Sequence, residues 1–306
     1  MSAIHLSAIC YEHGEPRPVS ELGDEAAQLT LPDSGLADYL VSDREIWDMA
    51  AAVCERSLAK SPGPPDLLVY VSENDRSPAA SLEKIARRLG LSTIAYLAVC
   101  GYGCGNMIPA LQMAKDALYS GRHDRVLLVL ADRAPDKERM MLSGLSVLSD
   151  GAVSCLVTRE LEQSAGSHFK VGAMTTRTDI GPDGKATAEP GLLSIIKLAV
   201  DGLADIAAQD DGKPDDVRYL VFGNYRITSQ KFLASAMGFP AERLLLGQVG
   251  ELGHCFSADC LVTLVQSAAG GRLELGDRII ASATGTHSLS MMTAECVRLP
   301  AANPPE

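Results

Sequence analysis

Short apolar runs alternate with amphipathic stretches along most of this chain. The runs are rich in Val, Leu, Ile and Ala, which is typical of strands that are buried on both faces. They lie at residues 67–71, 94–99, 126–130, 152–157, 219–222, 244–246 and 279–283. Apolar residues at helical spacing indicate helices at residues 81–89, 107–118, 194–208, 230–237 and 258–269. Strands that alternate with helices predict an α/β fold with a mixed or mostly parallel sheet.

Two segments depart from this alternation. Residues 172–191 are rich in Thr, Gly, Asp and Pro, and we expect a long loop there. Residues 300–305 consist of Pro, Ala and Asn, and we expect a frayed tail.

The order of the predicted elements occurs twice. Each half contains a strand, a helix, a second strand, a glycine-containing turn, another helix and a further strand. The turn of the first half carries Cys104, and the turn of the second half carries Gly253-His254. A period of roughly 150 residues exceeds that of solenoid repeats, so we interpret it as an internal duplication into residues 1–164 and 165–306. If the halves pack about a pseudo-twofold axis, the thiol and the imidazole face each other across one pocket.

Cys104 differs from the other cysteines of the chain, of which there are eight in all. It lies in Gly101-Tyr102-Gly103-Cys104-Gly105-Asn106, between a predicted strand and a predicted helix. A thiol there would lie close to unpaired N–H groups and to the positive end of a helix dipole, which favour the nucleophilic thiolate. No Cys-x-x-Cys pair occurs, so neither a zinc ribbon nor a thioredoxin-type redox motif is expected. Most of the other cysteines are expected to be reduced, buried, small hydrophobic residues.

Composition narrows the classes of partner. The formal net charge of −12 argues against a nucleic-acid partner and would repel anionic membrane surfaces. No apolar stretch reaches the roughly 18 residues that a membrane span needs. The first residues show no signal-peptide pattern. We therefore expect a cytoplasmic protein that binds neither nucleic acid nor membrane.

Three segments carry a family resemblance. They are residues 104–121, the turn Ser149-Asp150-Gly151-Ala152 and residues 276–299. In this order they resemble the segment after the nucleophile, the Gly-Asp-Gly-Ala turn and the final strands of ketosynthase III-type condensing enzymes of the thiolase superfamily. The resemblance covers nearly the whole chain. It implies a thiolase-like fold, in which two duplicated βαβαβ-type halves form a layered α/β/α/β/α core, and it implies acyl-transfer chemistry.

The departures from this family concern the partners of the cysteine. The family normally uses a His, from a motif after the strand predicted at 219–222, and an Asn near Gly253. In this chain the stretch after residues 219–222 contains no histidine, and the position after Gly253 is occupied by His254. A His with an Asp five residues later is similar to a side branch of ketosynthase III-like enzymes from specialised metabolism. By that resemblance Cys104 is the nucleophile, His254 the base and Asp259 the carboxylate that orients it. Asp259 could instead favour the start of the next helix through its charge.

The chemistry of such a set is coherent. A neutral His can take the thiol proton, so that the thiolate attacks an acyl thioester and forms an acyl-cysteine. The tetrahedral oxyanion needs hydrogen-bond donors, for which we predict the Cys104 N–H and a backbone N–H near Gly285. His287 is a rival base, since it lies in the loop expected to line the same pocket. Asn224 is a candidate hydrogen-bond donor where the family's His stands.

The same departures affect the expected reaction. The His/Asn pair of the family stabilises the enolate that forms when a malonyl thioester loses carbon dioxide. One imidazole with a carboxylate is better suited to deprotonating a nucleophile, which favours acyl transfer to oxygen, nitrogen or sulfur. Neither a metal nor a cofactor is expected, since the acyl group arrives on coenzyme A or an acyl carrier protein.

The donor and the assembly follow from the resemblance as well. The family's initiating enzymes hold coenzyme A with a Trp and an Arg near the N-terminus, whereas the only tryptophan here is Trp47. A carrier protein therefore fits the donor role at least as well as free acyl-CoA. Carrier proteins are acidic, so we expect a basic patch that uses Arg226, Lys231 or Arg133. We expect a homodimer or a ketosynthase-like heterodimer.

Four other classes of protein share part of this sequence pattern. A decarboxylative 3-oxoacyl synthase for starter units stays open. So does a catalytically weak ketosynthase-like subunit of a heterodimer, although the presence of Cys104 counts against it. A hydrolase with a Gly-x-Cys-x-Gly elbow is excluded because neither Cys100 nor Cys104 has these neighbours. A phosphate-binding loop is disfavoured because no Gly-Lys-Ser/Thr follows the glycines.

Overall fold

A computed structural model describes residues 2–30, 32–135, 138–141, 144–180, 192–210 and 216–300 of the chain. One mixed sheet of nine strands dominates the fold, in the order β5-β4-β6-β7-β1-β8-β11-β10-β9. Its strands are β1 (Ile4–His13), β4 (Leu67–Val71), β5 (Ala95–Val99), β6 (Arg125–Asp132), β7 (Gly151–Thr158), β8 (His168–Thr178), β9 (Tyr219–Phe222), β10 (Arg278–Gly285) and β11 (Ser288–Arg298). A small second sheet pairs β2 (Glu15–Pro18) with β3 (Asp38–Val41).

The large sheet consists of two halves with the same topology. From the centre outward, the N-terminal half runs β1, β7, β6, β4, β5, and the C-terminal half runs β8, β11, β10, β9. In each half the first two pairings are antiparallel and the third is parallel. A parallel bridge between Leu220 and Leu244 stands where the counterpart of β5 would lie. The halves meet where β1 pairs with β8, so the duplication read from the sequence is present in the strand order.

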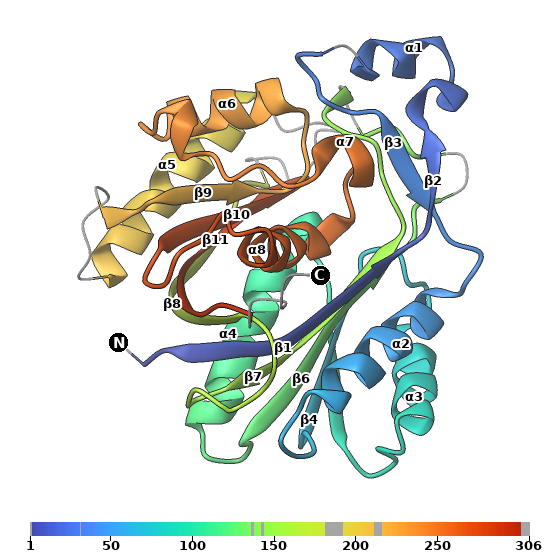
Figure 1. Cartoon of the computed structure of the whole chain (residues 1–306), viewed down its shortest axis with the longest axis vertical. Helices are drawn as coiled ribbons and strands as arrows, with labels where there is room; N and C mark the ends of the chain where they lie inside the picture. Colours follow the sequence, from blue (N-terminus) through green and yellow to red (C-terminus); the bar gives the residue numbers. More distant parts are fainter. Residues whose placement is uncertain are drawn as a thin grey trace, which may run out of the picture.

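Helices form three layers around the two half-sheets (Figure 1). The central helices α4 (Met107–Tyr119) and α8 (Asp259–Ala269) share one core with strands of both halves. The outer face of the N-terminal half is covered by α2 (Ile46–Ala59) and α3 (Pro78–Arg88). The outer face of the C-terminal half is covered by α5 (Leu192–Gln209) and α6 (Ile227–Ala236). The predicted α/β/α/β/α arrangement is therefore confirmed.

The uninterrupted apolar runs follow from this layering. In β6 the side chains of Val126, Leu128 and Leu130 face the central helices, whereas Leu127 and Val129 face α2 and α3. Successive side chains of a strand point to opposite faces, so a strand between two helical layers needs apolar residues at every position.

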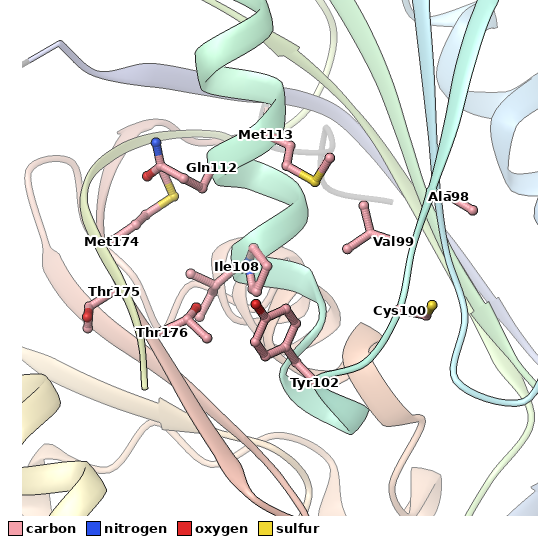
Figure 2. Close-up of a pocket in the computed structure, with 11 residues that line it drawn as sticks. Ala98, Val99, Cys100, Tyr102, Ile108, Gln112, Met113, Met174, Thr175 and Thr176 are labelled. Atoms are coloured by element: carbon pink, nitrogen blue, oxygen red, sulfur yellow. The ribbon is translucent and has the colours of Figure 1, made fainter. Parts of the chain in front are cut away.

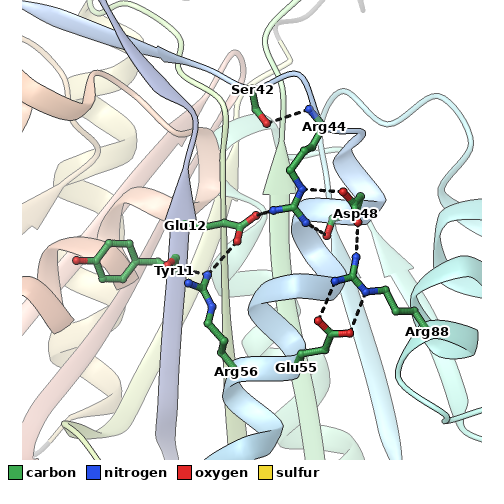
Figure 3. A network of polar contacts seen from close by, with 8 residues as sticks. All are labelled: Tyr11, Glu12, Ser42, Arg44, Asp48, Glu55, Arg56 and Arg88. Carbon is green, nitrogen blue, oxygen red and sulfur yellow. Dashed lines mark hydrogen bonds and ion pairs between the residues drawn. The ribbon is translucent and has the colours of Figure 1, made fainter.

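A network of ion pairs ties the N-terminal outer layer to the sheet (Figure 3). Arg44 bridges Glu12 of β1 at 2.6 Å and Asp48 of α2 at 2.7 Å. Arg88 of α3 joins Asp48 and also Glu55, the latter at 2.8 Å. Exposed ion pairs contribute little singly, so their main consequence here is to fix how α2 and α3 lie on β1.

The structure corrects several sequence predictions. The long elements β1, β8, β11 and α2 were not predicted, and neither were the short β2, β3, α1 (Asp24–Ala27) and α7 (Val249–Leu252). The loop expected at residues 172–191 is wrong up to Thr178, where β8 ends, and residues 181–191 lie outside the described part. The strand expected at 244–246 is reduced to the Leu244 bridge. Most of the tail at 300–305 lies outside the described residues, and the division at residue 164/165 stays a prediction that falls between β7 and β8.

No helix among the described residues combines the length and the apolar character that crossing a membrane requires.

Candidate active site

Cys104 lies in a tight turn between β5 and α4. The turn, called the nucleophile turn below, is the short 3-10 segment Gly103–Gly105. Cys104 is buried there, with 6% of its surface exposed. Gly103 has a φ of +56° in the left-handed region, which favours glycine. A Cβ on Gly103 would also lie only 3.1 Å from the Gly285 Cα. The glycines that frame the cysteine therefore permit both the backbone conformation and the close approach of β10.

His254 is positioned by the second turn. Gly253 has a φ of +57°, and a Cβ there would lie 2.6 Å from the Ser149 Oγ. The His254 N–H donates to the Val147 carbonyl at 2.8 Å, and its own carbonyl accepts from the Ser149 N–H at 2.9 Å. The Ser149-Asp150-Gly151 motif therefore belongs to the segment that holds the histidine backbone.

Two aromatic rings flank the imidazole. The Tyr225 ring lies 5.2 Å from it and the Phe256 ring 5.9 Å, measured between centroids. The Tyr225 hydroxyl hydrogen-bonds to Thr284 Oγ1 at 2.7 Å, so the ring is itself fixed. Phe256 has a φ of +51°, a strained value for a bulky residue, as is found where structure holds a functional group in place.

The structure brings the three residues named from the resemblance into contact. His254 Nε2 lies 3.0 Å from Cys104 Sγ, and His254 Nδ1 hydrogen-bonds to Asp259 Oδ2. All three side chains are buried. The cysteine comes from the N-terminal half and the other two from the C-terminal half, so the pair of facing turns expected from the duplication is observed.

Asp259 is the first residue of α8, and its carboxylate accepts three hydrogen bonds. Besides His254, it accepts the Asn224 N–H at 2.6 Å and the Cys255 N–H at 2.8 Å. A buried carboxylate with three donors is held in one orientation, and through Nδ1 it determines which imidazole nitrogen faces the thiol.

Two effects besides the helix dipole act on the Cys104 thiol. Burial raises the pKa of the Cys104 thiol well above its usual value, and the nearby Glu73 carboxylate raises this pKa further. Both effects oppose that of the helix dipole, on which the sequence prediction of a thiolate rested. His254 Nε2, at 3.0 Å from Sγ, is placed to take the thiol proton.

The remaining predicted pocket residues lie at different places. Gly285 contacts the nucleophile turn through the close approach to Gly103. His287 lies in the turn between β10 and β11, where its carbonyl accepts the Asp179 N–H, and no hydrogen bond among the described residues joins it to Cys104. The Asn224 side chain points towards Gly247. A Cβ on Gly247 would lie 2.3 Å from Asn224 Oδ1. Asn224 reaches the site through its backbone N–H instead.

Two contacts at this site were not expected from the sequence. Glu73 Oε2 lies 3.5 Å from Cys104 Sγ, and Tyr225 packs on the imidazole. Both residues follow a parallel strand of the sheet, Glu73 after β4 and Tyr225 after β9. Residues beyond the carboxyl ends of parallel strands often line a site, and that position was the available signal.

The residues proposed for a basic patch are spread over two regions. Arg226 caps the start of α6 and Lys231 lies in the middle of that helix, and Arg226 Nε donates to Ser229 Oγ at 3.0 Å. Arg133 follows β6, with its Nε 3.8 Å from the buried Asp150 carboxylate. A role for these residues in carrier-protein binding stays a prediction.

An open, mostly apolar hollow of about 440 Å³ lies beside the nucleophile turn (Figure 2). It is formed by the end of β5, by α4 and by β8, and Tyr102 and Ile108 lie together beside the turn. The lining residues are Ala98, Val99, Cys100, Tyr102, Ile108, Pro109, Gln112, Met113, Met174, Thr175 and Thr176.

Comparison with known proteins gives consistent matches. Residues 207–290 match the family model for the C-terminal part of 3-oxoacyl-[acyl-carrier-protein] synthase III. The curated beta-ketoacyl-[acyl-carrier-protein] synthase III 3 of Streptomyces coelicolor is 26% identical, over 92% of this chain and 91% of that protein.

Solved structures share the fold. ChlB3, described as an acyltransferase, matches with a TM-score of 0.82 and 20% identity, over 97% of this chain and 98% of that one. The synthase III FabH from Pseudomonas aeruginosa PAO1 matches with a TM-score of 0.77 and 17% identity, over 97% and 99%. At such identities the likeness establishes the thiolase-like fold alone. Together with the family model and the curated relative, it supports a ketosynthase III-like, acyl-transferring synthase of the thiolase superfamily.

Proposed function

We propose that the chain transfers an acyl group through a covalent acyl-Cys104 intermediate. The observation that carries this proposal is the buried chain of contacts from Cys104 Sγ through His254 to Asp259. When a thioester binds, the thiol proton moves to His254 Nε2 as Sγ attacks the carbonyl carbon. The proton then passes to the departing sulfur of coenzyme A or of the carrier protein, which leaves as a thiol.

Asp259 supports the charge that appears during this step. His254 becomes an imidazolium between a forming thioester and a carboxylate, and the hydrogen bond to Asp259 stabilises that cation. The oxyanion forms beside the nucleophile turn, for which we propose the Cys104 N–H and a backbone N–H near Gly285 as donors. No cofactor is required, because the thioester already supplies the activated acyl group.

For the second step we propose an oxygen, nitrogen or sulfur acceptor. A single imidazole held by a carboxylate can deprotonate such a nucleophile as it attacks. Tyr225 lies in the stretch after β9 where the family's His is expected, and its hydroxyl is already engaged by Thr284 Oγ1. A decarboxylative synthase for starter units and a weakly active partner subunit remain the alternatives.

We also propose that a second ketosynthase-like chain covers β5, as a homodimer or heterodimer. Among the described residues, β5 is an outer strand of the sheet and pairs only with β4. Large apolar side chains are exposed on it and beside it, with 46% of Tyr96 in β5 and 43% of Met113 in α4 accessible. An open strand edge with apolar neighbours favours pairing with another chain.

The test of the acyl-enzyme is a labelling experiment. Incubation with short acyl-CoA and acyl-carrier-protein donors, followed by intact-mass measurement, should show an adduct of one acyl group. Cys104→Ala should abolish it, whereas Cys100→Ala should retain it, because Cys100 is exposed and has no hydrogen bond to an imidazole among the described residues. Absence of labelling by every donor would favour the partner-subunit alternative. Release of carbon dioxide from a malonyl thioester, with a 3-oxoacyl product, would favour the decarboxylative one.

A further inference from the structure

An unpaired carboxylate lies beside the nucleophile. Glu73 Oε2 is 3.5 Å from Cys104 Sγ, so the sulfur has the His254 imidazole as one neighbour and this carboxylate as another. Much of the Glu73 side chain is accessible to solvent. Among the described residues, no Lys, Arg or His forms an ion pair with it. Its negative charge is therefore not compensated by a neighbouring cation.

The position of Glu73 is fixed by the fold. Asp132, buried at the end of β6, accepts three hydrogen bonds on Oδ1 from the loop after β4. The donors are the Ser72 hydroxyl at 2.8 Å, the Glu73 N–H at 2.8 Å and the Asn74 N–H at 2.9 Å. Glu73 Oε1 also lies 3.6 Å from the position that a Cβ on Gly103 would take. The absence of a side chain at Gly103 therefore leaves room for the Glu73 carboxylate. Glu73 is thus held at the reacting sulfur by a buried anchor.

We propose that Glu73 selects the acceptor of the acyl group by charge, in the order cationic, neutral, anionic. This inference rests on the proposed acyl-Cys104 intermediate. A cationic amine, or any nucleophile with an N–H or O–H, meets an acceptor of its hydrogen bond beside the acyl carbonyl. The carboxylate of a malonyl-type thioester would meet a like charge at short range, which is unfavourable in a partly desolvated site.

The transfer step balances without any further reagent. The acceptor heteroatom forms a bond to the acyl carbon, and the bond from that carbon to Cys104 Sγ breaks. The N–H or O–H proton of the acceptor moves to His254 Nε2 and then to the cysteine sulfur, which regains its thiol. An ammonium acceptor first releases its extra proton to solvent, to which Glu73 is open. Glu73 is a carboxylate at the start and at the end.

A pair of thiol reagents tests the charge selection without any knowledge of the substrate. In a Cys100→Ser background, Cys104 is treated with 2-aminoethyl methanethiosulfonate, a cation, or with 2-sulfonatoethyl methanethiosulfonate, an anion, and labelling is located by peptide mass. The same thiolate attacks both reagents, forming a disulfide as methanesulfinate leaves, so a change in the thiol pKa cancels in the ratio of the two rates. We expect Glu73→Gln to lower the cation-to-anion ratio about tenfold, the order expected for removing a unit charge a few ångströms away.

Glu83→Gln is the matched control. Glu83 is an exposed residue of α3, so this variant changes the net charge equally but leaves the site intact. It should keep the wild-type ratio. An unchanged ratio in Glu73→Gln, or an equal change in Glu83→Gln, would overturn the proposal.

A second measurement separates this inference from the acyl-enzyme itself. Preformed acyl-enzyme is discharged by cysteamine, 2-mercaptoethanol or 3-mercaptopropionate, which are cationic, neutral and anionic thiols of similar size. The wild type should react in that order, and Glu73→Gln should react with all three at similar rates. If no donor acylates Cys104, the proposed function fails while the reagent ratio still decides the charge selection. If acylation succeeds and both proteins discharge alike, the selection by Glu73 is refuted.

Discussion

Asp259→Asn removes the charge behind the imidazole while keeping the shape of the side chain. The native carboxylate accepts from three donors, the His254 Nδ1–H, the Asn224 N–H and the Cys255 N–H. An amide has one oxygen and one NH₂ group. In either orientation, the NH₂ group faces at least one N–H donor inside the protein. One buried donor left without an acceptor costs about 1–3 kcal/mol of folding free energy.

The loss in rate has a separate origin. During acylation His254 becomes a cation, and a hydrogen bond between two charged groups stabilises it by about 1.5–3 kcal/mol relative to a neutral partner. Loss of that stabilisation in the transition state slows acylation of Cys104 roughly 10- to 150-fold. The amide can also favour the imidazole tautomer with its proton towards the sulfur, which adds to the effect.

Single-turnover acylation, quenched on a millisecond-to-minute scale and read by intact mass, measures this rate. The matched control is Asp277→Asn, since Asp277 is also buried and accepts the Glu274 N–H at 2.8 Å but lies outside the site. It should lose folding stability without a change in acylation rate. Acylation of Asp259→Asn within threefold of wild type would refute the reasoning.

Two further predictions concern the surroundings of the nucleophile. Burial raises the pKa of Asp132 to about 7, so the unfolding free energy should fall as the pH rises from about 4 through 7, because the unfolded chain ionises this group more readily. Urea unfolding between pH 5 and 8 should show a smaller fall for Asp132→Asn, and parallel profiles of the two proteins would contradict this. In Gly285→Ala, the new Cβ would lie 2.1 Å from the Tyr102 carbonyl oxygen, so the nucleophile turn must move. We expect this variant to lose about 1–3 kcal/mol of folding stability and to acylate about tenfold more slowly or worse. Gly202→Ala is the control and should acylate normally, because its new Cβ meets only side-chain atoms, the nearest at 3.3 Å.

One strand that the sequence failed to predict, β11, shows why such elements are missed. In β11 every residue from Ser288 to Ala294 is buried, although several are Ser or Thr. Their hydroxyls are satisfied across the sheet: Thr293 Oγ1 accepts the Ala173 N–H at 2.9 Å, and Ser290 pairs with Thr176 at 3.0 Å. A search for apolar runs cannot recognise such strands, since the partners of the polar side chains come from a strand more than 110 residues away.

The contacts of the site also differ in how far the sequence predicts them. The contact between Cys104 and His254 was accessible from the sequence because it follows from the repeated order of elements. For Glu73 the sequence offered only its place after a parallel strand, because its approach to Cys104 depends on a loop conformation set by Asp132, which lies 59 positions further along the chain. No periodicity or turn signal encodes that anchor.

The location of the reacting pair on two different halves has a consequence for the newly made chain. Synthesis proceeds from the N-terminus, so Cys104 emerges 150 positions before His254. Until the second half is made, Cys104 lacks the imidazole that lies 3.0 Å from its sulfur in the folded protein. The proposed acyl transfer therefore requires both halves to be folded, and a chain that ends before His254 has the thiol without this proton acceptor.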